Sequence, residues 1–233
     1  DGGSTWVQRI TSIYNASWSA ISSSADGTKL AACAYDGFIY TSANSGTTWT
    51  MRLGTTRRRW SSITSSSDGT KLSACVCSDN AYTGYIYTST DSGVNWTRQT
   101  ASTGKDWISI ASSSDGSKLA ACVCGGYIYT SVDGGATWSE RTVVGSQNWS
   151  SIASSADGDK LVACVYDGYI YTSTDSGESW SRRTVAGERK WKSIASSTYG
   201  IKLAAAVYYG SGYIHTSVDS GSTWAEQTSS DIR

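Results

Sequence analysis

The side chains that could support chemistry are few and stand in short charged or aromatic segments. These segments are Arg57-Arg58-Arg59, Asp79 with Tyr82, Lys105-Asp106, and Arg189-Lys190. Two carboxylates about 5–10 Å apart would allow glycoside hydrolysis. Aromatic faces beside polar groups would instead suit the binding of sugars or peptides. The sequence therefore has to be examined for hydrolysis and for recognition.

Support for catalysis is weak. The chain has one histidine, His215, so a metal cluster or a Ser-His-Asp triad has a single imidazole to draw on. His215 also stands where other repeats have Tyr129 and Tyr171, which indicates a strand residue rather than a base. We expect no catalytic residue, no metal and no cofactor. The acids expected in the loops form no recognisable pair: Asp36, Asp79, Asp106 and Asp167.

The charged segments recur at fixed places in a repeat. Five copies begin at Trp18, Trp60, Trp107, Trp149 and Trp191, with offsets of 42, 47, 42 and 42 residues. In the copy that starts at Trp149, four short extended segments are separated by turns such as Asp157-Gly158, and no helical spacing occurs. Four strands in a unit of this length predict one blade of an all-β propeller.

The turn before the fourth strand carries a specific motif. Asp accepts N–H bonds within its own turn, and Gly permits positive φ. The pattern Ser-x-Asp-x-Gly-x-x-Trp resembles the Asp-box, or bacterial neuraminidase repeat, of β-propellers. The resemblance implies a structural hairpin on the face away from the ligand site. The structural motif residues are Asp91, Asp133, Asp175 and Asp219, with Asn44 in the first repeat and Asp1 in a truncated copy.

The repeats predict a single domain over residues 1–233, with five blades of four antiparallel strands. Residues 1–10 hold a sixth copy of the fourth strand, so we expect the ring to close by strand exchange between the termini. The surplus copy could also pair with another chain and cause self-association. A fragment, an open form or a larger assembly is the alternative, because Asp1 begins inside a motif and is not Met.

Composition narrows the classes of partner. The 19 basic and 19 acidic residues balance, so neither nucleic acid nor an anionic membrane is indicated. No apolar stretch approaches the roughly 20 residues of a membrane span. A Cys77–Cys124 link between repeats is an alternative to free thiols. Four cysteines share one repeat position and are interpreted as small buried hydrophobes: Cys33, Cys75, Cys122 and Cys164.

The repeats differ mainly at one end of the predicted blades. The Asp-Gly turns and the motif turns hardly vary, whereas the blade connections and the loops between second and third strands do. Three sequons, at Asn15, Asn95 and Asn148, indicate N-glycosylation and an extracellular, secreted protein. The predicted ligand-binding residues lie in the variable loops: Arg57, Arg58, Arg59, Asp79, Tyr82, Lys105, Asp106, Arg189 and Lys190.

The sequence favours a non-enzymatic recognition or structural propeller that binds carbohydrate or protein through its variable loops. A sialidase-like glycoside hydrolase is the alternative that the Asp-box resemblance implies. Sialidases of that family also use an Arg-Ile-Pro motif and an arginine triad, but this chain has no proline and groups Arg57–Arg59 in one loop. A further alternative is an intracellular scaffold that resembles the photosystem II assembly propellers.

Overall fold

The computed structural model describes residues 4–5, 7–9, 16–52, 57–77, 84–102, 104–208 and 213–228. These residues form strands and turns, with two short 3-10 helices, η1 (Thr100–Ser102) and η2 (Thr184–Ala186). No helix in this part of the chain is long and apolar enough to cross a membrane. The all-β prediction is confirmed.

The strands come in groups of four that follow the predicted repeats, and each group is called a blade below. The first two blades contain β1 (Ser17–Ser23), β2 (Leu30–Tyr35), β3 (Ile39–Ser42), β4 (Thr50–Met51), and β5 (Trp60–Ser65), β6 (Leu72–Val76), β7 (Ile86–Ser89), β8 (Thr97–Gln99). The next two contain β9 (Trp107–Ser112), β10 (Leu119–Gly126), β11 (Ile128–Ser131), β12 (Ser139–Arg141), and β13 (Gln147–Ser154), β14 (Leu161–Gly168), β15 (Ile170–Ser173), β16 (Ser181–Arg183). The fifth contains β17 (Arg189–Ser196), β18 (Leu203–Val207), β19 (Ile214–Ser217) and β20 (Ala225–Gln227).

Each blade is an antiparallel meander, so strands that are neighbours in the chain are neighbours in the sheet. In the fourth blade, Leu161 on β14 pairs with Ser154 on β13 and with Ser173 on β15. Tight Asp-Gly turns permit this order because glycine accepts the positive φ of the bend, as at Gly158 with φ 75°. A register shift follows the tryptophan of each first strand, and such bulges bend the strand.

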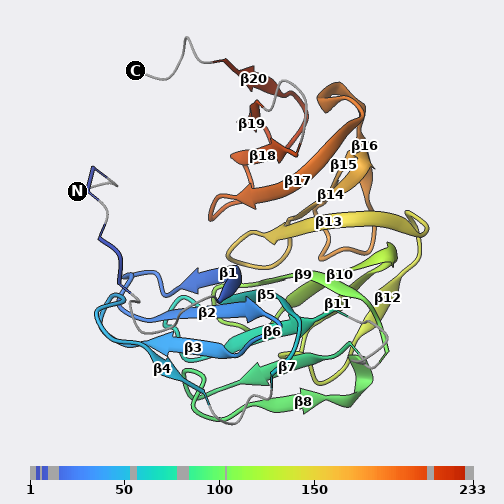
Figure 1. Cartoon of the computed structure of the whole chain (residues 1–233). Coiled ribbons are helices and arrows are strands. Elements are labelled where there is room, and N and C mark those ends of the chain that lie inside the picture. The colour runs from blue at the N-terminus through green and yellow to red at the C-terminus, as the bar shows by residue number, and fades with distance from the viewer. Residues whose placement is uncertain are drawn as a thin grey trace.

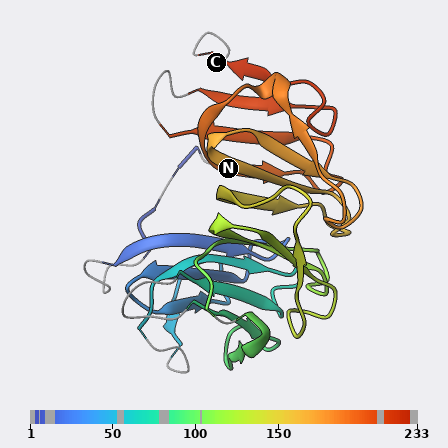
Figure 2. The same ribbon diagram turned by 90° about the vertical axis from the view of Figure 1, so that its right-hand side faces the viewer.

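The five blades follow one another along an arc, from the first blade (blue) to the fifth (red) (Figures 1 and 2). The first strands β1, β5, β9, β13 and β17 contact one another in that order. Adjacent blades also share short ladders, in which Cys124 pairs with Asn148 and Tyr166 pairs with Lys190. A continuous series of contacts therefore joins the first blade to the fifth.

The predicted closure of the ring is not confirmed. Among the described strands, no strand of the first blade pairs with a strand of the fifth. The C-terminal copy of the fourth strand, β20, pairs with β19 and completes the fifth blade. In the N-terminal copy, residues 7–9 form no strand, and Asp1 lies outside the described residues. Strand exchange between the termini and self-association through a spare strand stay predictions.

The hydrophobic core lies between the blades. Trp191 and Ile194 of the fifth blade pack against Val162, Cys164 and Ile170 of the fourth, and all five are buried. The same repeat positions meet between the first and second blades and between the third and fourth blades. Burial of these aliphatic and aromatic side chains therefore stabilises the arc by joining blade to blade.

The cysteines take part in this packing. All six are free thiols in the structure, with Cys77 half-buried and Cys124 exposed. Burial raises the pKa of the Cys33 and Cys164 thiols to about 11, so they stay protonated near neutral pH. Those at the shared repeat position are buried, as expected of small hydrophobes: Cys33, Cys75, Cys122 and Cys164.

Packing between blades predicts that Ile128→Ala lowers the free energy of unfolding by about 2–5 kcal/mol, because Ile128 is buried and its loss leaves a cavity. Val132→Ala in the same blade is the control, since Val132 is 67% exposed and its truncation should cost under about 0.5 kcal/mol. Denaturant titration of both variants measures the difference. Similar losses at the two positions would contradict a core located between the blades.

Candidate functional site

The turns of the blades lie on two opposite faces. In the second blade the Ser92 N–H donates to the Thr70 carbonyl, and in the fourth the Ser176 N–H donates to the Asp159 carbonyl. These bonds hold each Asp-Gly turn beside the hairpin turn that precedes the fourth strand, and we call this surface the turn face. The blade connections and the loops between second and third strands lie at the other strand ends, which form the loop face.

The hairpin turns before the fourth strands are compact hydrogen-bond networks. In the fourth blade, Asp175 Oδ1 accepts the Ser173 hydroxyl at 2.8 Å and the Ser179 N–H at 2.9 Å. The Ser173 hydroxyl oxygen accepts the Gly177 N–H, and Trp180 Nε1–H donates to the Gly177 carbonyl. In the other blades the side-chain Oδ1 at this position likewise accepts the backbone N–H of the residue four positions later. The accepting residues are Asn44, Asp91, Asp133 and Asp219.

These bonds keep the turn carboxylates ionised. The hydroxyl and N–H of Ser179 lower the pKa of Asp175 to about 2. Donors within their own turns also lower the pKa of Asp91, Asp133 and Asp219 to about 2. A general acid needs a pKa near the working pH. None of these four carboxyl groups can therefore supply a proton near neutral pH.

The structure spreads the predicted ligand-binding residues along the loop face. Arg57 Nη2 lies 2.9 Å from Asp36 Oδ2, and both side chains are largely exposed. Arg189 Nη2 lies 3.6 Å from Glu226 Oε2. The Asp106 carbonyl accepts the Cys124 N–H from β10 of the same blade, at 2.9 Å. Two predicted residues lie outside the described part of the chain: Asp79 and Tyr82.

Cations on the loop-face side of the blades stand over tyrosine rings. Arg58 Cζ lies 5.4 Å from the centre of the Tyr87 ring, and Lys105 Nζ lies 4.8 Å from that of Tyr129. The ring quadrupole attracts such cations and fixes their position. The loop face therefore presents positioned positive charges. The other pairs of this kind are Arg59 with Tyr35, Arg98 with Tyr85, Arg182 with Tyr169, and Lys192 with Tyr208.

His215 is a strand residue on β19, as the sequence indicates. Its side chain is buried and lies edge-on to the Trp191 ring. Burial lowers the pKa of His215, with Arg189 acting in the same direction and Glu226 against it. A buried, neutral imidazole packed on an indole is poorly placed to take a proton from a ligand.

Sequence reasoning missed a series of charged residues on the fourth strands. The Tyr129 hydroxyl donates to Glu140, and His215 Nε2 lies 3.6 Å from Glu226 Oε2. Both acids face their partners directly across the strand pair. Comparison of the repeats at this position could have found the set, because the sign of the charge alternates along Arg98, Glu140, Arg182 and Glu226.

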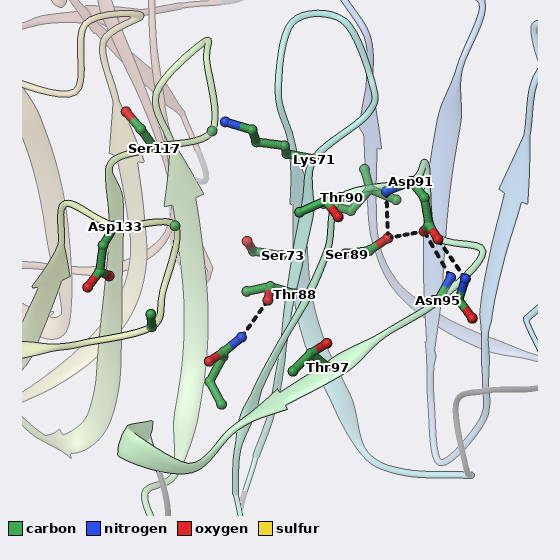
Figure 3. A pocket seen from close by; sticks show the side chains of 15 residues that line it. Lys71, Ser73, Thr88, Ser89, Thr90, Asp91, Asn95, Thr97, Ser117 and Asp133 are labelled. Atoms are coloured by element: carbon green, nitrogen blue, oxygen red, sulfur yellow. Dashed lines mark hydrogen bonds between the residues drawn. The ribbon is translucent and has the colours of Figure 1, made fainter.

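A groove of about 430 Å³ lies between the second and third blades, toward the turn face. Figure 3 shows Ser73, Thr88 and Thr97 in its middle, with Asp91 and Asp133 on opposite sides. Ser73 is 6% exposed, and its hydroxyl has no hydrogen-bond partner among the described residues. The lining is therefore rich in donors and acceptors: Lys71, Ser73, Thr88, Asp91, Asn95, Thr97, Gln99, Ser117 and Asp133.

The equivalent grooves at the next two junctions hold only about 10 Å³ each. Between the third and fourth blades, Asp159 accepts from Lys118 Nζ and from the Ser176 hydroxyl, which ties the two blades together. At the open junction the positions of Asp159 and Ser176 are occupied by Ser117 and Gly134. The small groove between the fourth and fifth blades has Ile201 in place of Asp159 but keeps a serine, Ser220, so the glycine at position 134 is what distinguishes the open junction.

The predicted glycosylation sites lie in different settings. Asn148 is exposed on the loop face. Asn95 lines the groove, and its Nδ2 donates to Asp91 Oδ2 at 2.7 Å. Asn15 lies outside the described residues, and glycosylation stays a prediction at all three positions. No group of three or more metal-ligating side chains occurs in the described ranges.

No family model matches this chain, and no curated protein matches it. The GH74 enzyme from Niastella koreensis is similar in structure, with a TM-score of 0.69 and 19% identity over 92% of this chain and 32% of that one. YCF48 from Cyanidioschyzon merolae is similar with a TM-score of 0.69 and 19% identity, over 97% of this chain and 76% of that one. The structure of YCF48 bound to D1 peptide is similar with a TM-score of 0.69 and 20% identity, over 98% of this chain and 72% of that one.

The chain therefore spans about a third of the GH74 enzyme and about three quarters of the YCF48 chains. At identities of 20% or less these likenesses show the fold, which is of the β-propeller type. Fold alone does not determine function, so the function has to be argued from this chain's own side chains.

The hairpin network predicts different effects for two substitutions of Asp175. Asp175→Ala removes the acceptor for Ser173 and Ser179 and should lower the thermal midpoint by about 2–4 °C, the shift expected for roughly 1 kcal/mol. Asp175→Asn keeps Oδ1, as Asn44 does in the first blade, and should lose less than half as much. Calorimetry compares them. Equal losses would show that the charge, rather than the Oδ1 acceptor, stabilises the turn.

Proposed function

We propose that this chain is a non-catalytic recognition propeller whose loop face binds acidic segments of a partner protein. The observation that carries the proposal is the array of cations held over tyrosine rings on that side of the blades. Positioned cations beside aromatic rings complement carboxylates and the side chains around them. The peptide in the YCF48 structure bound to D1 peptide, a similar fold, supports a peptide ligand here.

The carboxylates favour binding over hydrolysis. Asp91 and Asp133 line the groove between the second and third blades, but hydrogen bonds within their own turns lower the pKa of each to about 2. Hydrolysis of a glycoside by paired carboxyl groups needs one that is protonated near neutral pH. The similarity to a GH74 enzyme supports the enzymatic alternative at the level of fold only.

The fifth blade offers the most accessible part of the proposed surface. Lys190 and Lys192 are exposed on β17, and Lys192 Nζ lies 5.6 Å from the centre of the Tyr208 ring. The Tyr166 and Tyr208 rings lie 6.3 Å apart, so a patch of two tyrosines is flanked by lysines from one strand. An acidic segment can pair with these lysines while its other side chains cover the rings.

Binding of a fluorescein-labelled peptide of alternating glutamate and serine tests this function. Fluorescence anisotropy should show binding that weakens as salt rises, since the attraction is between exposed charges. Lys190→Glu combined with Lys192→Glu should weaken it at least about tenfold, the effect of roughly 1.4 kcal/mol.

Lys71→Glu is the control, because Lys71 is exposed on the turn face and its substitution makes the same charge change as each single β17 substitution. This control should leave peptide affinity within about twofold of the original chain. Affinity that is unaffected by the two β17 substitutions, or that depends equally on Lys71, would contradict binding through the loop face.

We propose carbohydrate binding as a second candidate function, and the groove of Figure 3 is the observation that favours it. Its lining combines the unpartnered hydroxyl of Ser73 with Thr97, Asn95 and ionised carboxylates. Such groups donate to and accept from the hydroxyls of a sugar. None of the described residues that line the groove is aromatic, so binding to them would depend on hydrogen bonds rather than on stacking.

Closing the groove by design tests this candidate. Ser117→Asp with Gly134→Ser copies the bridge that Asp159 makes with Lys118 and Ser176 at the neighbouring junction. Saturation-transfer NMR with a panel of neutral oligosaccharides should detect binding to the original chain and lose it with the closed variant. Asp159→Ser with Ser176→Gly is the control, and it should keep the binding. Equal signals from the open and closed grooves would exclude this site.

A further inference from the structure

The two ends of the arc expose side chains that are buried at the other blades. Trp18 is 43% exposed, whereas the tryptophans at its repeat position in the other four blades are at most 1% exposed. Ile21 is 64% exposed, whereas its four counterparts are 4–6% exposed. At the opposite end Ile214 is 52% exposed, whereas its four counterparts are at most 1% exposed. Both ends therefore lack the cover that a neighbouring blade provides.

Each blade has two different faces, and a junction joins one of each kind. The Trp face of the fifth blade, with Trp191 and Ile194, packs on the Cys face of the fourth, with Val162, Cys164 and Ile170. The exposed face of the first blade is a Trp face, with a hollow of about 370 Å³ lined by Trp18, Ser19, Ala20, Ile21, Ala32 and Trp49. By repeat position, the exposed face of the fifth blade is a Cys face formed by Ala195, Ala204, Ala206 and Ile214.

Backbone hydrogen bonds mark the same two ends. Along the turn face, N–H groups of one blade donate to carbonyls of the next: Ala25 to Ser67, Ser67 to Ser114, Ser114 to Ala156, and Ala156 to Thr198. In the described structure no carbonyl accepts the Thr198 N–H, and no N–H reaches the Ala25 carbonyl. The series thus stops with one donor at the fifth blade and one acceptor at the first.

The Asp-Gly turns give independent support. A Cβ added at Gly158 would lie 2.8 Å from Lys118 of the preceding blade, and Gly69, Gly116 and Gly200 are similarly close to a preceding lysine. A Cβ added at Gly27 would meet nothing within 4 Å. Lys202 is exposed at the other end, and its Nζ has no acceptor among the described residues. Gly27 and Lys202 are therefore the two residues of a glycine–lysine contact that the other junctions make and that is not made between the end blades.

We propose that these end faces are the two halves of one interrupted blade junction, and that further blades carrying the same repeat occupy the position between them. Only such a blade presents a Cys face to Trp18 and, on its other side, a Trp face to Ile214. It also supplies an N–H for Ala25, a carbonyl for Thr198, a lysine over Gly27 and a glycine under Lys202. Exposed apolar surfaces of this kind mark interaction sites.

One similar structure, YCF48 from Cyanidioschyzon merolae, indicates how much chain such further blades would need. Because 97% of these 233 residues fills 76% of the YCF48 chain, about 70 residues of that chain remain unmatched. Repeats in this sequence are 42 to 47 residues long, so the remainder corresponds to between one and two blades. A whole second copy would bring five blades to the same position.

Appending the chain's own repeats tests the proposal. Residues 142–183 form one unit, the connection plus the fourth blade, and one, two or three copies are placed after Gln227. In the original chain Ile21→Ser should move the thermal midpoint by less than about 2 °C, because Ile21 is exposed. At the length that completes the ring, the same substitution should cost at least about 6 °C, since Ile21 becomes buried.

Val132→Ser is the control, because Val132 is 67% exposed on the turn side and should respond equally at every length. A small effect of Ile21→Ser at all lengths would overturn the proposal. A large effect in the original chain at low concentration would also overturn it, because the five blades would then close on themselves. An effect that grows with protein concentration would assign the faces to a second copy instead, and light scattering would show its mass.

Discussion

The structure depends on one repeated contact, the packing of a Trp face on a Cys face. At this contact Trp149 and Ile152 of one blade are buried against Cys122 and Ile128 of the blade before it. A four-stranded blade has little core of its own, so burial between blades supplies most of the hydrophobic stabilisation. The strands that carry this contact repeat closely, whereas loops outside it differ without loss of the fold.

The hairpin turns explain why so many acids contribute so little chemistry. Asp133 and Asp175 are acceptors for N–H groups and hydroxyls of their own turns, which orders the chain before the fourth strand. The same bonds hold their pKa near 2, and this removes them as proton donors. Under the proposed function, the turn face is structural, and recognition belongs to the loop face and to the groove where the turn residues differ from the repeat.

Local features were predictable and long-range ones were not. Alternation and Asp-Gly turns specify a four-stranded meander because strand pairing within a blade involves neighbours in the chain. Ring closure depends on the number of blades in the ring. The sequence of a single repeat does not specify that number. The groove was missed because it needs Ser73 from one blade together with Ser117 and Gly134 from the next. The stacking of Arg58 on Tyr87 was missed because it depends on strand register.

Repetition makes the exceptions informative. Where every junction is built from the same residues, a junction that differs can be traced to a few side chains, as Gly134 replaces a serine at the open groove. The same reasoning applies at the ends, where the residues are those of an ordinary junction but the neighbour is absent. A nearest-neighbour assembly loses one interface term at each uncovered face. The first and fifth blades are therefore the least stabilised parts of the arc, although their sequences carry the residues that a further blade would bury.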